Sequence, residues 1–155
     1  MSADVKTTIS GYLAKMGLES TFDAQKNLFQ SRIKIKNNVN GNEFDFPIAV
    51  VLFPDGWVSI EIAVIDLRDK PPELSLEKIY DGMLRANLLI PEVNYALYDS
   101  MIISIAWSHK SALNYENFMA EFSGVVSGVA NFGRIISYAK SFSAPPPKEF
   151  SPIYQ

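Results

Sequence analysis

The chain has 155 residues, 48% of them hydrophobic, which predicts one folded domain with its own core. It contains no cysteine, and this excludes disulfide bonds, thiolate nucleophiles and cysteine metal ligands. Its 14 basic and 17 acidic residues give a net charge of -3, so the chain offers no broad positive field to nucleic acid or to an anionic membrane.

The N-terminal part predicts one helix and one strand. Apolar residues recur at helical spacing from about Ala3 to Met16, and Gly17 is suited to end that helix. From Phe29 to Lys36 isoleucines alternate with basic residues, which indicates a half-exposed strand. No apolar run follows a basic cluster near the N-terminus, so we expect no signal peptide and a cytoplasmic location.

The clearest hairpin is centred on Pro54-Asp55-Gly56, which suits a three-residue loop with glycine in the left-handed conformation. Pairing about this loop joins apolar residues on one face. The predicted pairs are Leu52 with Val58, Val50 with Ile60, Ile48 with Ile62 and Phe46 with Val64. The other face is mixed rather than polar, which is unusual for a sheet face in contact with water.

A second helix and a second hairpin follow. Ser75 is positioned to cap the helix, and Pro91 prevents its continuation. Its apolar residues form one stripe, the pattern of a helix that packs on a core: Leu76, Ile79, Tyr80, Met83, Leu84 and Leu88. The apolar segments 93–98 and 101–107 then flank Asp99-Ser100, which predicts the hairpin.

The C-terminal part predicts a long helix and a tail. Asn114 is suited to cap a helix from Tyr115 to about Ala139, in which apolar residues recur at helical spacing. The proline-rich residues that follow predict a domain over residues 1–140 and an extended or disordered tail over residues 141–155. The elements together predict an α+β fold with helices on one antiparallel sheet of about five strands, in the order α-β-β-β-α-β-β-α.

The stretch from Met83 to Ile105 reads MLRANLLIPEVNYALYDSMIISI. Residues 84–87 (LRAN) close a helix, and residues 95–97 (YAL) open the strand, turn and strand that follow. In this order of elements the chain resembles the YbjN-type proteins and the related type III secretion chaperone-like fold, over Ala3 to Ala139. The turn Tyr98-Asp99-Ser100 stands where the family turn is often rich in Asp-Gly, and the proline-rich tail is not part of the family pattern.

The resemblance implies a small acidic protein that dimerises and binds another polypeptide, or a regulator that acts through protein contacts. It carries over no catalytic residue. An enzyme of unrecognised type is the alternative, with Glu61, Asp66 or Asp69 near the single histidine, His109. Glu61 and Asp66 have opposite strand parity, so we expect them on opposite faces. Asp66, Asp69 and Glu73 match no calcium-loop spacing, and we expect no metal and no cofactor.

Small residues line one side of the long helix. They are Ala120, Gly124, Ser127, Gly128 and Asn131. Glycine costs roughly 1 kcal/mol relative to alanine inside a helix, so its repetition indicates close approach by another element. That element is either a second copy at a dimer interface or the chain's own sheet.

The mixed face of the first hairpin is the other candidate contact surface. We expect Val51, Phe53, Trp57 and Ile65 to bind a partner, unless a helix covers them. The tail suits docking in an aromatic groove or folding back on its own domain, unless it is disordered. The sequence therefore favours a non-enzymatic, homodimeric module that binds a protein or peptide.

Overall fold

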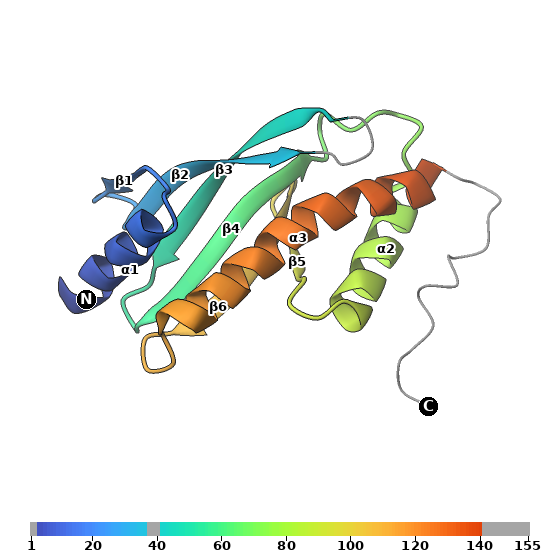
Figure 1. Ribbon diagram of the computed structural model, residues 1–155. Helices are drawn as coiled ribbons and strands as arrows, with labels where there is room; N and C mark the ends of the chain where they lie inside the picture. Colours follow the sequence, from blue (N-terminus) through green and yellow to red (C-terminus); the bar gives the residue numbers. More distant parts are fainter. Residues whose placement is uncertain (1–2, 37–40, 141–155) are drawn as a thin grey trace.

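The computed structural model describes residues 3–36 and 41–140 (Figure 1). Its helices are α1 (Ala3–Lys15), α2 (Leu76–Leu89) and α3 (Tyr115–Lys140). Its strands are β1 (Ser20–Asp23), β2 (Leu28–Lys36), β3 (Glu43–Leu52), β4 (Trp57–Asp66), β5 (Tyr95–Tyr98) and β6 (Met101–His109). The tail expected at residues 141–155 lies outside the described residues.

The strands form one antiparallel sheet in the order β1-β2-β3-β4-β6-β5. In Figure 1, α3 runs across the sheet, α1 lies near β1 and β2, and α2 packs beside the C-terminal half of α3. The α+β class is confirmed, but the sheet has six strands rather than five. The missed strand, β1, is only four residues long, which is too short for alternation to reveal it.

The core lies between the helices and one face of the sheet, and it has two parts. The first cluster joins α1, β2, β3 and β4 to the N-terminal half of α3, with Ile9, Ile62 and Val125 fully buried. The second joins α2, β5 and β6 to the C-terminal half of α3, around Ile79 and Ile102. Because α3 contributes to both clusters, it holds the two halves of the sheet together. We call the opposite sheet face the open face.

The first hairpin has the predicted register over most of its length. Leu52 pairs with Val58, Val50 with Ile60 and Ile48 with Ile62. Gly56 has a φ of 97°, as the predicted loop requires. The fourth expected pair, Phe46 with Val64, does not form, because the pairing of β3 with β4 ends at Ile48 and Ile62. Phe46 and Val64 nevertheless both pack against the first core cluster.

A bulge in β4 reverses the parity of its last residues. The pairing with β6 shifts between Ala63 and Ile65, so that Ile65 lies opposite the buried Ile102 and packs against the second core cluster. Ile65 is therefore not on the open face with the other three predicted partner-binding residues. The same shift puts Asp66 on the open face, the face that Glu61 occupies, so the expectation of opposite faces was wrong. An unpaired residue within a strand leaves no mark on the hydrophobic pattern.

The stripe predicted on α2 is only partly buried. Ile79 and Met83 face the core, together with Ala86. Leu84 and Leu88, by contrast, are 70% and 75% exposed. Leu84 directly follows the buried Met83, which rotates it by about 100° around the helix axis, and Leu88 lies four positions further along on the same side. The apolar surface of α2 is therefore wider than the area that α3 and the sheet cover.

Asn87 fixes the edge strand β5 to α2. Its side-chain amide donates to the carbonyl oxygen of Tyr95 at 3.1 Å, and its side-chain oxygen accepts from the Tyr95 N–H at 2.7 Å. Both Tyr95 backbone groups are thus paired, although β5 is the last strand of the sheet. This contact gives the asparagine of the LRAN stretch a structural role.

We expect Asn87→Ala to destabilise the fold by about 1 to 3 kcal/mol, because two backbone groups of Tyr95 lose their partner. Asn131→Ala is the matched control, since Asn131 makes a single bond to Ser127 within an exposed turn of α3. Urea unfolding of the two variants measures the difference. Equal stability of the two variants would show that the Asn87 contact contributes nothing.

Candidate functional site

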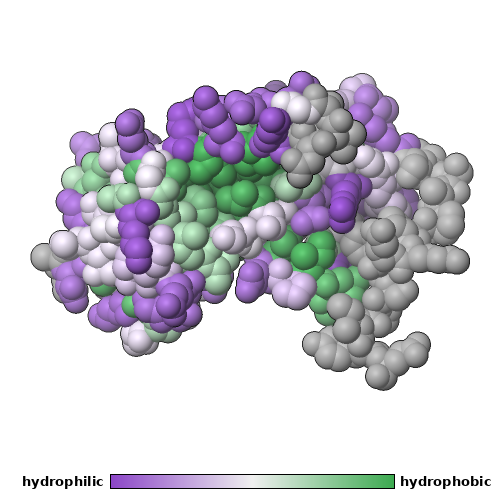
Figure 2. Space-filling view, in the orientation of Figure 1, coloured by the Kyte–Doolittle hydropathy of each residue, from purple (hydrophilic) through white to green (hydrophobic). Residues whose placement is uncertain are grey.

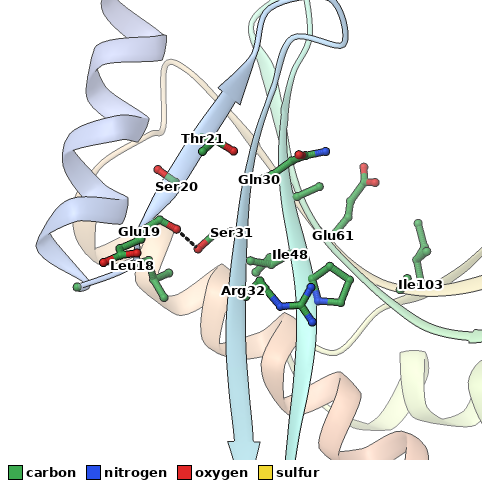
Figure 3. Close-up of a pocket in the computed structure, with 14 residues that line it drawn as sticks. Leu18, Glu19, Ser20, Thr21, Gln30, Ser31, Arg32, Ile48, Glu61 and Ile103 are labelled. Carbon is green, nitrogen blue, oxygen red and sulfur yellow. Dashed lines mark hydrogen bonds between the residues drawn. The ribbon is translucent and has the colours of Figure 1, made fainter.

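The open face is hollowed next to β1. Its groove has a volume of about 1100 Å³ and crosses from β1 to β6 (Figure 3). Side chains from five strands line it, among them Thr21, Gln30, Arg32, Pro47, Ala49, Glu61 and Ile103. Figure 3 shows Gln30 of β2 and Glu61 of β4 projecting into this space from the two sides of β3. No helix covers this groove among the described residues.

The groove mixes hydrogen-bonding groups with apolar surface. Ser59 donates to Glu61, and Arg32 forms an ion pair of 2.9 Å with Asp45 near the end of the groove. Pro47, with the neighbouring alanines, contributes apolar surface between these polar groups. Such alternation suits an extended polypeptide, which offers backbone donors and acceptors between its side chains.

An aromatic pocket lies at the other end of the open face. Phe53, Asp55, Trp57 and Trp107 line its volume of about 400 Å³. The rings of Phe53 and Trp107 are 5.2 Å apart, and Trp57 packs at 5.3 Å against His109. The two tryptophans are 44% and 47% exposed. Half-exposed tryptophans beside one another form an apolar platform of the kind that anchors partner side chains.

Sequence reasoning found part of this pocket. Phe53 and Trp57 line it as expected, and Val51 lies next to it, in a row with Ser59 and Trp107. Ile65 does not belong to it, for the reason given above. Sequence reasoning missed Trp107. Its place beside Trp57 follows from the pairing of β4 with β6, which puts Ser59 opposite Trp107 and Trp57 opposite His109, and no local pattern predicts that pairing.

The two glycines of the small-residue ridge contact their own chain. A Cβ atom at Gly128 would lie 2.1 Å from the Ser104 hydroxyl oxygen, and one at Gly124 would lie 2.3 Å from the Glu92 carbonyl oxygen. Both glycines are buried, so close approach by the chain's own sheet and loop explains them. Ala120 and Ser127 are exposed, and Asn131 is half-buried.

Buried hydroxyl groups complete this contact. Ser104 donates to the Val125 carbonyl oxygen at 2.9 Å, and the Tyr95 hydroxyl donates to the carbonyl oxygen of Gly128. Burial raises the pKa of Tyr95, so its phenol stays protonated and keeps its donor. The interface of α3 with β5 and β6 is therefore specified by polar bonds as well as by close packing.

The carboxylates of the enzyme alternative do not converge on the histidine. His109 lies opposite Trp57 at the start of β4, whereas Asp66 lies opposite Met101 at the other end of that strand. The guanidinium of Arg68 binds Asp66 and holds the pKa of that carboxyl well below its usual range. His109 instead contacts the Ser111 hydroxyl at 2.8 Å.

The described residues contain neither a cluster of metal ligands nor a membrane-spanning helix. No group of three or more histidine and carboxylate side chains is placed to hold a metal ion in residues 3–36 and 41–140. No helix within the same ranges is long and apolar enough to cross a bilayer.

Further apolar surface lies on the helix side of the molecule. Figure 2 shows hydrophobic atoms gathered between α1 and α3, where the strands of the sheet are drawn in Figure 1, and more of them over α2. On α2 the exposed leucines are Leu84 and Leu88. On the neighbouring strand β5, Leu97 is 48% exposed and lies opposite the buried Ile102, on the same side of the sheet. Sequence reasoning missed this surface because it assigned both leucines to the stripe that faces the core.

No protein-family model and no curated protein matches the sequence. Several solved structures match the fold. In the HopA1-SchA chaperone-effector complex the likeness has a TM-score of 0.56 at 13% identity, over 84% of this chain and 93% of that chain. The likeness to the ExoU-SpcU complex from the type III secretion system of Pseudomonas aeruginosa has a TM-score of 0.53 at 14% identity. It covers 83% of this chain and 97% of that chain.

A third match is a Yersinia pestis structure, the type III secretion chaperone SycH in complex with a fragment of YscM2. It has a TM-score of 0.51 at 12% identity, over 81% of this chain and 97% of that chain. The YbjN half of the expected resemblance stays a prediction. The chain has the fold of the type III secretion chaperones.

Proposed function

We propose that this protein is a non-enzymatic module that binds a polypeptide on the open face of its sheet and acts as a homodimer. The observation that carries the proposal is the pair of half-exposed tryptophans, Trp57 and Trp107, which line a pocket on the same sheet face as the groove. The chaperone fold supports it, since the matched structures are complexes with other polypeptides. We further propose a cytoplasmic location, which fits a chain without cysteine.

The mode of binding follows from the surface. An extended segment lying in the groove would find donors and acceptors on Gln30, Arg32 and Glu61. An apolar side chain of that segment would be buried in the aromatic pocket, at about 25 cal/mol for each Å² removed from water. We assign the partner contact to Val51, Phe53, Trp57 and Trp107.

The dimer contact is assigned to α2. Two leucines four positions apart lie on the same side of a helix, and both are largely exposed here. With Leu97 of β5 they supply apolar surface to a second copy. The α3 ridge is the weaker choice, because Gly124 and Gly128 already contact their own chain.

We expect Trp57→Ser to weaken partner capture by about thirtyfold, the effect of losing an anchor worth about 2 kcal/mol. Phe44→Ser is the matched control, because Phe44 is 47% exposed and lies at the far end of β3. Affinity capture from lysate with quantitative mass spectrometry compares both variants with the parent chain. If Trp57→Ser retains the same bound proteins as the parent, the open face is not the binding surface.

A further inference from the structure

We infer that the aromatic pocket binds a proline-rich segment that carries a lysine, and that the occupant is the C-terminal segment of a second copy of this chain. This inference deepens the proposed function, because it names one segment bound by the same face. It rests on the composition of the pocket, on the sequence that follows α3, and on the distance between the two.

The pocket has the chemistry that recognises proline. Polyproline ligands dock in shallow grooves lined with aromatic side chains, because the proline rings stack on aromatic faces and the preformed backbone loses little entropy. Phe53, Trp57 and Trp107 supply three such faces around about 400 Å³. The ring of Trp57 is held by its contact with His109, and that of Trp107 by its contact with Phe53.

A carboxylate at the rim adds a charge preference. Asp55 lines the same pocket, and its carboxylate accepts from the backbone N–H of Trp57 at 3.3 Å, which keeps it beside the tryptophan. A lysine that follows the prolines of a ligand would come close to this negative charge. The chain contains such a sequence itself, because Pro145-Pro146-Pro147 precedes Lys148.

The segment of the same chain does not reach the pocket. The 26 residues of α3 make a helix of about 39 Å. The pocket lies near the N-terminal end of that helix, since Lys110, five residues before its start, donates to the carbonyl oxygen of Gly56 in the pocket hairpin. Lys148 follows Lys140 by eight residues, which span at most about 29 Å. The prolines are nearer still to Lys140, so a second copy must supply them.

Tryptophan fluorescence tests the inference directly, because both tryptophans of the chain line the pocket. The receptor is the full-length chain in which Pro145, Pro146 and Pro147 are each changed to serine, so that its own segment does not compete. The probe is a synthetic peptide of residues 142–155, which contains no tryptophan. We expect a saturable change in emission, and binding at least about tenfold weaker when the same three prolines of the peptide are replaced by serine.

Two receptor variants test the contribution of the Asp55 carboxylate. Asp55→Asn should weaken peptide binding by about two- to fivefold, the range expected for the loss of an exposed ion pair. Asp4→Asn, which removes an exposed carboxylate in the first turn of α1, should leave binding unchanged. An emission that does not respond to the peptide, equal binding of the serine peptide, or equal effects of the two aspartate variants would each overturn the inference.

The second copy is tested by sedimentation velocity. The parent chain should form larger species with rising concentration than the variant with three serines, and identical profiles would overturn the assignment to a second copy. Failure of these tests would reject the C-terminal segment as the ligand, whereas only the capture experiment with Trp57→Ser decides whether the open face binds other polypeptides. The two failures are therefore distinguishable.

Discussion

Gly128→Ala is expected to destabilise the protein by about 2 to 3 kcal/mol, with a fall in Tm of about 5 to 10 °C. The new methyl group would lie 2.1 Å from the hydroxyl oxygen of Ser104 and 3.1 Å from its Cβ atom. Ser104 is fully buried and hydrogen-bonded to Val125, so it has no open space to move into without losing that bond. The steric cost therefore exceeds the gain of about 1 kcal/mol that alanine brings to a helix. Urea unfolding measures the free energy.

Gly133→Ala is the matched control on the same helix. Nothing lies within 4 Å of a Cβ atom at Gly133, and the residue is exposed. We expect this variant to be more stable than the parent by up to about 1 kcal/mol. A loss of stability in Gly128→Ala together with a gain in Gly133→Ala would establish that Gly128 is closely packed within the chain. If Gly128→Ala kept its stability and instead dissociated a dimer, the glycine would belong to an interface between copies.

Ser104→Ala in the Gly128→Ala background tests the contact itself. Removing the hydroxyl group takes away the closest clash, although the Cβ atom of residue 104 remains. The double variant should therefore recover part of the lost stability, which gives a favourable coupling between the two positions. Simple addition of the two single effects would contradict the proposed clash.

Changing Leu84 and Leu88 together to glutamate is expected to convert the proposed dimer to a monomer of about 17.3 kDa. Two charges would be placed in the centre of an apolar contact, where each must lose its hydration without a partner. Because both leucines are largely exposed, the fold of the single chain should not change. Light-scattering mass gives the oligomeric state, and circular dichroism checks the fold.

The matched control is the double variant Ala120→Glu and Ser127→Glu, which puts the same charges on two exposed small residues of α3. It should remain dimeric. Dissociation of this variant, with α2 variants unaffected, would return the dimer contact to the α3 ridge that the sequence suggested. A parent chain that is monomeric at every concentration would reject the homodimer altogether.

The α3 variants separate two effects: Gly128→Ala tests stability, and the double variant Ala120→Glu and Ser127→Glu tests association. Gly124 and Gly128 lie on the side of α3 that faces the chain's own sheet and the loop before β5. Ala120 and Ser127 lie on exposed parts of the same helix. A small residue in a helix can therefore serve either packing within the chain or contact with another chain, depending on the side of the helix on which it lies.

Much of the fold was open to prediction from the sequence because its signals are local. Period-two alternation predicted β2, and the Pro54-Asp55-Gly56 loop set the register of β3 and β4. Capping by Ser75 and Asn114 predicted where α2 and α3 begin. Each of these features depends on residues close together in the chain, so it can be predicted without knowledge of the rest of the molecule.

The candidate site depended on features that are not local. The β4 bulge reversed the faces of Ile65 and Asp66, and no residue pattern announces an unpaired position in a strand. The exposure of Leu84 and Leu88 follows from how much of α2 the neighbouring elements cover. Trp57 and Trp107 lie on one face and in one pocket because β4 pairs with β6, and no local pattern predicts that pairing.

The sequence by itself determined the α+β class, most element boundaries, the register of the first hairpin and the absence of cysteine chemistry, since local periodicity and composition fix these. Only the tertiary structure decided which apolar residues remain uncovered, and that the glycines of α3 serve packing within the chain. Whether a side chain is buried depends on elements far apart in the sequence, because only their packing in the folded chain covers it.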